Sequence, residues 1–400
     1  MTSTTDLAAR LYPELRALRR AIHADPELGN DNPRTQGRIL GALAGLDLEI
    51  TTGRAVTSVV AVLRGTAPSE GPRPAVLLRG DMDGLPVVEA TGQEFASTTG
   101  TMHACGHDLH VAGLVGAAKI LHELRDQLPG DVVFMFQPGE EGPGGAGPMI
   151  DDGVLEAAGR RVDAAYGLHV SSHEHALGVW SGRPGPLMAA ADQCYITVHG
   201  RGGHGSQPHL AADPVPVACE IGLALHAMVT RQVDVFDPVV VTIGRIQAGT
   251  KDNIIPDDAR LDATVRTFSP ANREAMPQRM TRLAHGIAEA HGMSADVDYV
   301  RGYPVTVNDT GEYAHLVDTV IDLFGADRYV EQPFPLAGAE DFSLVAEQVP
   351  TAYIFVSAYP GDDPATAPAN HSAHALFDDE VLADNAALLA EVALRRLQRG

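Results

Sequence analysis

The spacing of apolar residues over the first half of the chain alternates between a helical period and short continuous runs. Leucine and isoleucine recur every three or four residues across 7–24, which predicts an opening helix that ends at Asp25-Pro26. Another helical stretch covers 110–124. The runs of strand length are Thr57–Leu63, Ala75–Leu78, Val132–Gln137 and Ala164–His169. This order predicts an α/β sheet covered by helices, in which ligands collect beyond the carboxyl ends of the strands.

The pattern changes near residue 187, where amphipathic strands and helices replace the buried runs. The segments predicted there, in the order strand, helix, strand, strand, helix, strand, are Gln193–Gly200, Pro214–Thr230, Val239–Gln247, Arg260–Phe268, Asn272–Ala290 and Ala295–Tyr303. After Pro304 the chain shows a helical stretch, the segment Pro335–Phe342 and a closing helix from Asp379. We therefore predict one domain formed by residues 1–186 and 304–400, and an α+β domain of typical size inserted at 187–303.

Composition excludes several classes of function. The formal net charge of −23 would repel phosphate, which argues against nucleic acid and anionic membranes as partners. The polar start of the chain lacks the apolar core of a signal peptide, and no 18 apolar residues run together. Three cysteines are too few for a disulfide framework and fit a reducing compartment, so we expect a cytoplasmic protein. Cys194 and Cys219 lie in apolar patterns, which predicts that both are small buried residues.

The densest group of candidate metal ligands lies in the stretch Met102–His110. Its candidate side chains are Cys105, His107, Asp108 and His110. A thiolate, imidazoles and a carboxylate are costly to bury unpaired, and they are the groups that bind borderline metals such as zinc. The stretch therefore indicates a catalytic metal centre, with a solvated polar loop as the alternative.

Further candidate ligands follow the predicted strands. Glu140 and Glu141 come after Val132–Gln137, and adjacent carboxylates at a strand end point different ways, so one can bind metal while the other acts as a base. The alternative is a solvated acidic turn. His169 ends a strand and His371 follows a long loop; either histidine alone is more typical of a hydrogen-bonded core residue. Joined to Cys105, His107 and Glu141, these histidines complete a set that could hold two metals with a bridging water.

The predicted insert carries three other candidates. Glycines around His204 free the backbone to expose its imidazole, although a simple glycine-rich hairpin is the alternative. The stretch fits neither a phosphate-binding loop nor a serine elbow. Asn253 and Arg266 are candidates for binding substrate, and the guanidinium of Arg266 offers a bidentate fork for a carboxylate.

Taken in order, these segments resemble the motifs of one family: the hippurate hydrolase, auxin-conjugate hydrolase and N-acyl-amino-acid amidohydrolase group of aminoacylase-like metallopeptidases. The resemblance spans nearly the whole chain and is most specific where Met102–His110 is followed by Gln137–Glu141. The matching segments are Arg79–Pro86, Met102–His110, Phe136–Glu141, Gly167–Val170, Gly202–His209, Asn253–Asp257, Gly338–Phe342 and His371. The chain departs from the family at Gly139, where alanine is more common, and at 30–32, where Asn30, Asp31 and Asn32 stand in place of the usual glutamate.

The resemblance implies a zinc-peptidase-like catalytic domain, with a mixed central sheet flanked by helices, and an inserted lid and dimerisation domain. It implies two divalent metal ions per subunit, zinc, manganese or cobalt, with Glu140 as general base and acid. The implied metal ligands are Cys105, His107, Glu141, His169 and His371. By the same resemblance Asp83 orients a ligand imidazole, His204 stabilises the oxyanion, often in the partner subunit's site, and Asn253 and Arg266 lie near the substrate carboxylate.

We therefore expect a metal-dependent amidohydrolase, and a homodimer through the inserted domain. Its predicted substrates are N-acyl amino acids, hippurate-like or N-acetylated, cleaved to a carboxylic acid and an amino acid. A dipeptidase or a deacetylase of small metabolites would use the same centre. A metal-binding dimeric scaffold without turnover is the remaining alternative, and the presence of Glu140 beside a full ligand set argues against it because a scaffold needs no base.

Overall fold

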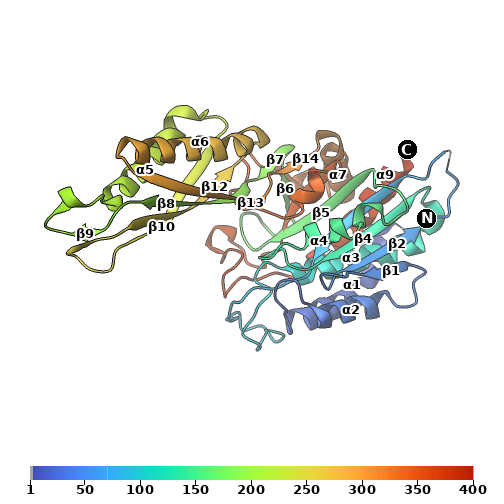
Figure 1. Ribbon diagram of the computed structural model, residues 1–400. Coiled ribbons are helices and arrows are strands. Elements are labelled where there is room, and N and C mark those ends of the chain that lie inside the picture. Colours follow the sequence, from blue (N-terminus) through green and yellow to red (C-terminus); the bar gives the residue numbers. More distant parts are fainter. Residues whose placement is uncertain (1–2, 70, 400) are drawn as a thin grey trace. The chain divides into compact units, whose positions relative to one another are not determined.

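The computed structural model describes residues 3–69 and 71–399 and divides the chain into two compact units (Figure 1). The first unit comprises Met1–Gly185, Val307–Phe334 and Leu344–Gly400, and the second comprises Pro186–Thr306 and Pro335–Ser343. The second unit thus takes in the segment 335–343, which the sequence pattern assigned to the first domain. Within the described ranges, every helix is too short or too polar to cross a bilayer.

Eight strands form the sheet of the first unit, in the order β1-β2-β4-β3-β5-β16-β6-β15. They are β1 (Glu49–Thr52), β2 (Val59–Arg64), β3 (Ala75–Asp81), β4 (Asp131–Gln137), β5 (Ala164–Ser171), β6 (Trp180–Gly182), β15 (Tyr329–Glu331) and β16 (Thr351–Ser357). The central strands β4, β3, β5 and β16 run parallel. Strand β2 is antiparallel to both of its neighbours, whereas β6 is antiparallel to β16 and parallel to β15. The predicted mixed sheet is confirmed. All residues of the four central strands are buried, which is why they read as continuous apolar runs.

Helices cover this sheet. They are α1 (Thr4–His23), α2 (Pro33–Leu43), α3 (His107–Glu123), α4 (Ala146–Asp151), α7 (Thr310–Phe324), α8 (Ser343–Ala346) and α9 (Val381–Gln398). Helices α3 and α9 pack against each other and against β3 and β5, and α1 packs across both helices. Helix α3 is buried almost all round because its sequence has little polar face. The buried helix α3 therefore fixes its N-terminal residues firmly against the sheet.

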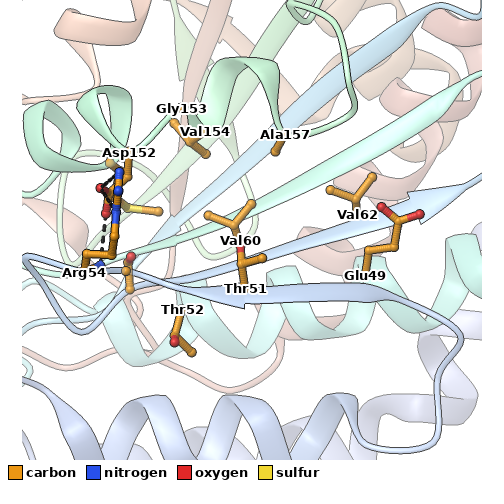
Figure 2. Close-up of a pocket in the computed structure, with 13 residues that line it drawn as sticks. Glu49, Thr51, Thr52, Arg54, Val60, Val62, Asp152, Gly153, Val154 and Ala157 are labelled. Carbon is orange, nitrogen blue, oxygen red and sulfur yellow. Dashed lines mark hydrogen bonds and ion pairs between the residues drawn. The ribbon is translucent and has the colours of Figure 1, made fainter.

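Shorter elements connect these parts. Two further short strands are β7 (Gly185–Met188) and β14 (Thr306–Asn308), and the 3-10 turns are η1 (Arg125–Gln127), η2 (Val154–Glu156), η3 (Pro208–Leu210), η4 (Ala326–Arg328) and η5 (Pro364–Thr366). A groove of about 390 Å³ lies over β1 and β2, beneath residues 152–157. Figure 2 shows the ion pair between Arg54 and Asp152 at one end of this groove. None of the predicted site residues is among the described residues that line it.

The second unit is an antiparallel sheet of order β10-β12-β8-β13, with two helices packed on one face (Figure 1). Its elements are β8 (Ala190–His199), α5 (Pro214–Gln232), β10 (Val239–Ala248), β12 (Asp258–Thr267), α6 (Pro270–Ala290) and β13 (Ser294–Tyr303). Alternate residues of β8 and β12 point into the core, as the amphipathic pattern predicted. One prediction is wrong: Cys219 is exposed, because it lies on the outer face of α5, whereas Cys194 is buried.

Candidate metal centre

The parallel strands bring the predicted ligands to one edge of the first unit's sheet. Asp81 ends β3, Glu140 and Glu141 follow β4, and His169 lies near the end of β5. The donor atoms lie within 4.8 Å of one another in three overlapping groups, which are Cys105, His107 and His169; Cys105, Glu141 and His371; and His107, Glu140 and Glu141. All five residues predicted as ligands, together with Glu140, therefore meet in one cluster of the first unit.

Two backbone features make this convergence possible. Gly106 has a φ of 78°, and a Cβ at this position would lie 2.3 Å from Val170 Cγ2. Glycine therefore lets the turn between Cys105 and His107 approach the strand that carries His169. His371 has a φ of 71°, and its backbone N–H donates to the carbonyl of Ala104 at 2.8 Å. That bond ties the distant loop to the residue next to Cys105.

Hydrogen bonds fix the protonation pattern of two imidazoles. Nδ1 of His107 donates to the carbonyl of Asp83 at 2.8 Å, and Nδ1 of His169 donates to the carbonyl of Val170 at 2.7 Å. Because a carbonyl oxygen can only accept, Nδ1 carries a proton in both rings, and Nε2 is the nitrogen whose lone pair can bind a metal when the ring is neutral. Both histidines are thus oriented as metal ligands require.

The cluster fits a divalent metal ion. Nε2 of His107 and Oε1 of Glu141 are buried 3.8 Å apart, and neither forms a well-directed hydrogen bond with a described residue, although Asp81 Oδ2 lies 3.4 Å from the first and His371 Nε2 lies 3.2 Å from the second. Buried polar atoms without hydrogen bonds are costly, and a cation between them would satisfy both. Burial would raise the pKa of the Cys105 thiol, but the adjacent His169 holds that pKa well below its usual range and so favours the thiolate that binds metal.

Asp83 holds the turn that carries the two glutamates. Its Oδ1 accepts from the backbone N–H of Glu140 at 3.0 Å, and its Oδ2 accepts from that of Glu141 at 3.1 Å. The sequence analysis assigned this carboxylate to a ligand imidazole. In the structure the Asp83 carbonyl contacts His107, while Oδ1 is 3.6 Å from Nδ1, too far for a hydrogen bond.

The remaining residues of the Met102–His110 stretch bind elsewhere. Asp108 is fully buried; its Oδ2 lies 2.6 Å from Arg19 Nε and 2.9 Å from His23 Nδ1. Burial would raise the pKa of Asp108, but Arg19 and His23 hold it well below its usual range. His110 Nδ1 donates to Asp81, and its Nε2 accepts from the Val170 N–H at 2.9 Å. These contacts explain why only Cys105 and His107 of this stretch offer atoms to the cluster of all five predicted ligands.

Sequence reasoning assigned no role to two residues beside the cluster. Asp81 accepts from Arg79 at 2.9 Å and lies 3.4 Å from His107 Nε2. Asn370 donates from Nδ2 to Cys105 Sγ at 3.6 Å and to the carbonyl of Val170 at 3.1 Å. Their positions beside predicted residues, two before Asp83 and directly before His371, were the signals that could have found them.

The other predicted residues lie in the second unit. His204, on β9 (Gly203–His204), pairs with Ile254 of β11 (Ile254–Ile255), and Gly205 N–H donates to the carbonyl of Asn253 at 2.9 Å. His204 Nδ1 accepts from the Ser206 N–H at 3.1 Å, so a neutral ring carries its proton on Nε2. His204 is exposed, and this tautomer can donate a hydrogen bond.

Arg266 is not brought close to that hairpin. The hairpin adjoins the Asp258 end of β12, where Gly200 N–H donates to the carbonyl of Asp257. Arg266 lies eight residues further along the same strand, opposite Ala191. At about 3.3 Å per residue the separation is about 25 Å. One unit therefore does not gather His204, Asn253 and Arg266 around a single small substrate.

The central sheet and this donor cluster define a metal-dependent hydrolase of α/β architecture. The chain belongs to peptidase family M20/M25/M40, whose family model matches residues 77–395. The predicted relationship to aminoacylase-like metallopeptidases is thereby confirmed.

Relatives match the chain over nearly its full length. A thermostable carboxypeptidase 2 of Saccharolobus solfataricus is 38% identical over 370 residues, which cover 91% of this chain and 91% of the relative. An N-acetylcysteine deacetylase of Bacillus subtilis is 35% identical over 379 residues, covering 94% of this chain and 95% of the relative. A solved structure, that of a dinuclear metal-binding peptidase of the M20 family from Bacillus subtilis, has a TM-score of 0.83 at 31% identity and covers 98% of this chain and 99% of its own.

Proposed function

We propose that this protein hydrolyses the amide bond of N-acyl amino acids, releasing a carboxylic acid and an amino acid. The observation that carries the proposal is the position of Glu140 in the cluster of five candidate metal ligands, on a turn held by Asp83. The likeness to an N-acetylcysteine deacetylase supports an N-acylated amino acid as substrate. The likeness to a carboxypeptidase favours short peptides as the second candidate class.

The chain's residues divide the chemistry between them. Cys105, His107, Glu141, His169 and His371 would hold two divalent ions, which when bound supply Lewis acidity at the carbonyl and acidify water. The carboxylate of Glu140 takes a proton from the attacking water and passes it to the leaving nitrogen. Nε2–H of His204 donates to the oxyanion of the tetrahedral intermediate. The guanidinium of Arg266 binds the substrate carboxylate, with Asn253 as a further polar contact.

A second copy of the chain would complete the site. Arg266 is about 25 Å from the hairpin that carries His204 and Asn253, which is longer than an N-acyl amino acid. His204 and Asn253 at one end of this sheet and Arg266 at the other can then contact the same substrate only if one of the two ends belongs to a second subunit. Strand β10 is an edge strand, and the exposed residues Val240, Ile246 and Leu223 supply apolar surface for a second copy. The proposal is therefore a homodimer in which His204 acts on the partner's metal centre.

Mixing two inactive variants tests this arrangement. We expect His204→Ala and Glu140→Gln each to be inactive alone. After the dimers are dissociated and reassociated together, activity should return to about a quarter of the wild-type value, because half of the dimers would hold one intact site of two. If His204 acts within its own subunit, the mixture stays inactive. A mixture of Glu140→Gln with Glu141→Gln, both in the first unit, is the control that gains nothing in either case.

A substrate panel tests the function itself. The metal-free protein is loaded separately with zinc, manganese and cobalt and assayed for released amino acid on hippurate, N-acetyl amino acids, longer N-acyl amino acids and dipeptides. The proposal expects the N-acylated compounds to have the highest kcat/KM. Faster turnover of dipeptides would replace it with the peptidase function.

Metal removal separates an enzyme from a scaffold. We expect a chelator to abolish hydrolysis and to lower the thermal unfolding temperature, because an ion that binds only the folded state stabilises it. Adding back a divalent ion should restore both. If every metal restores stability and none supports turnover of any panel compound, the chain is a metal-binding scaffold.

A further inference from the structure

The segment 27–30 lies along two backbone stretches that shape the metal centre. The carbonyl of Glu27 accepts from the N–H of Gly84 at 2.7 Å, directly after Asp83. A Cβ on Gly29 would lie 3.4 Å from the ring of Pro143, in the loop that follows the two glutamates. The segment thus touches both the residue after Asp83 and the loop after the glutamates.

Asn30 makes the closest approach to the turn. A Cβ on Gly139 would lie 1.9 Å from Asn30 Oδ1 and 2.9 Å from its Cγ, so the amide of Asn30 occupies the space that any side chain at 139 would need. Gly139 directly precedes Glu140 and has a φ of 75°. The chain departs from the family pattern at Gly139 and in the stretch 30–32, to which Asn30 belongs. In the structure these two departures meet where Asn30 packs beside Gly139.

Hydrogen bonds fix the backbone of Asn30. Its carbonyl accepts from both the N–H and the Oγ1–H of Thr57, each at 3.0 Å. Asn32 Nδ2 donates to the carbonyl of Gly29, and Thr57 Oγ1 accepts from the Asn32 N–H. These bonds tie the loop 29–32 to the residues that lead into β2, so the loop is a fixed support. A fixed support can set the position of the residue packed on it.

We propose that Asn30 is a positioning residue for Glu140. Its amide fills the space beside the bare Cα of Gly139, while Asp83 holds the next two backbone N–H groups, and together they set where the Glu140 carboxylate lies. The inference rests on the proposed function, since it concerns the base of that reaction. Asn30 does not touch the reacting atoms; it acts through the turn.

A double-mutant cycle tests the proposal, with Asn30→Ala, Gly139→Ala and the double variant. Asn30→Ala opens a void beside the turn, and Gly139→Ala forces a methyl group against the amide. Each single change should lower kcat by about 10- to 100-fold, with KM and metal content unchanged, because a small displacement of a catalytic group costs that much. In the double variant the methyl group introduced at position 139 occupies the space that the amide leaves. Its kcat should return to within about threefold of wild type, a coupling typical of contacting residues.

Gly159→Ala is the matched control. Gly159 has a φ of 87° and would meet no described heavy atom within 4 Å, so the change adds the backbone strain of a side chain at positive φ without a collision. It should lower the unfolding temperature slightly and leave kcat unchanged. If Gly139→Ala fails to fold, the proposal expects the double variant to fold, because removing the Asn30 amide makes room for the methyl group.

A second measurement needs no substrate. Glu141 lies on the same turn, so the visible absorption of the cobalt-loaded protein should shift in each single variant and return in the double variant. Single effects that simply multiply in the double variant, in both kcat and absorption, would overturn the inference. If the wild type hydrolyses no panel compound while the cobalt bands and the unfolding temperature still show coupling, the proposed function is wrong and the contact between Asn30 and the turn stands.

Discussion

Replacing Glu140 by glutamine is expected to lower kcat by about 10²- to 10⁴-fold and to leave metal content and unfolding temperature unchanged. Glutamine has nearly the same shape, so the backbone N–H of residue 140 still donates to Asp83. The amide cannot accept the proton of water, and the reaction loses its base. Steady-state kinetics on the best N-acyl amino acid, with metal measured by elemental analysis of the same sample, checks both parts.

Glu141→Gln is the matched control for this prediction. The two glutamates are adjacent on one turn, and Asp83 accepts from both backbone N–H groups. Glu141 faces His107 and His371, with Oε1 at 3.8 Å and 3.2 Å from their Nε2 atoms. The Glu141→Gln substitution should therefore weaken metal binding, and activity should fall because metal is lost. Equal metal loss in both variants, or near wild-type turnover in Glu140→Gln, would show that the base has been assigned to the wrong residue.

Replacing Arg19 by methionine is expected to lower the free energy of unfolding by about 3–5 kcal/mol. Arg19 is fully buried on α1, with Nε 2.6 Å from Asp108 Oδ2 and an Nη atom 3.1 Å from Asp379 Oδ1. Methionine keeps much of the packing volume and removes the charge. Asp108 would be left as a buried anion beside the imidazoles of His23 and His103, without a permanently charged partner, and an uncompensated buried charge is costly. Urea denaturation monitored by circular dichroism measures the loss.

Arg10→Met on the same helix is the control. Arg10 pairs with Glu123, and both side chains are about half exposed. Exposed pairs contribute little, so this change should cost less than about 1 kcal/mol. If the two arginine variants lost similar stability, the effect would come from helix α1 in general and the argument from the buried ion pair would fail.

The continuous apolar runs and the motifs at their ends were sufficient to predict the main features of the fold. Three of the central strands, β3, β4 and β5, are buried on both faces and leave no polar alternation, so the continuous apolar runs predicted their positions. The fourth, β16, is equally buried but was not predicted. Parallel strands place their carboxyl ends together, which is why residues near 81, 140 and 169 could be expected to meet. Short strands such as β1 and β6 carry too few residues to form a pattern and were not predicted.

Within the Met102–His110 stretch, the family resemblance already implied Cys105 and His107 as ligands, and the tertiary structure shows the contacts that hold Asp108 and His110 elsewhere. By residue type alone, four side chains of this stretch are candidate ligands: Cys105, His107, Asp108 and His110. Asp108 is held by Arg19 of α1 and His110 by Asp81 of β3. The roles assigned to His204, Asn253 and Arg266 remain predictions.

The sequence by itself determined the set of chemical groups, because metal-binding side chains are few and their local spacing can be read directly. Contacts between distant segments were decided only on folding. The Asp83 carbonyl orients His107, Arg266 lies far along β12 from the His204 hairpin, and the amide of Asn30 fills the place of a side chain at Gly139. Each of these depends on packing and backbone direction across more than a hundred residues or between separate elements, and residue type alone does not encode such distances.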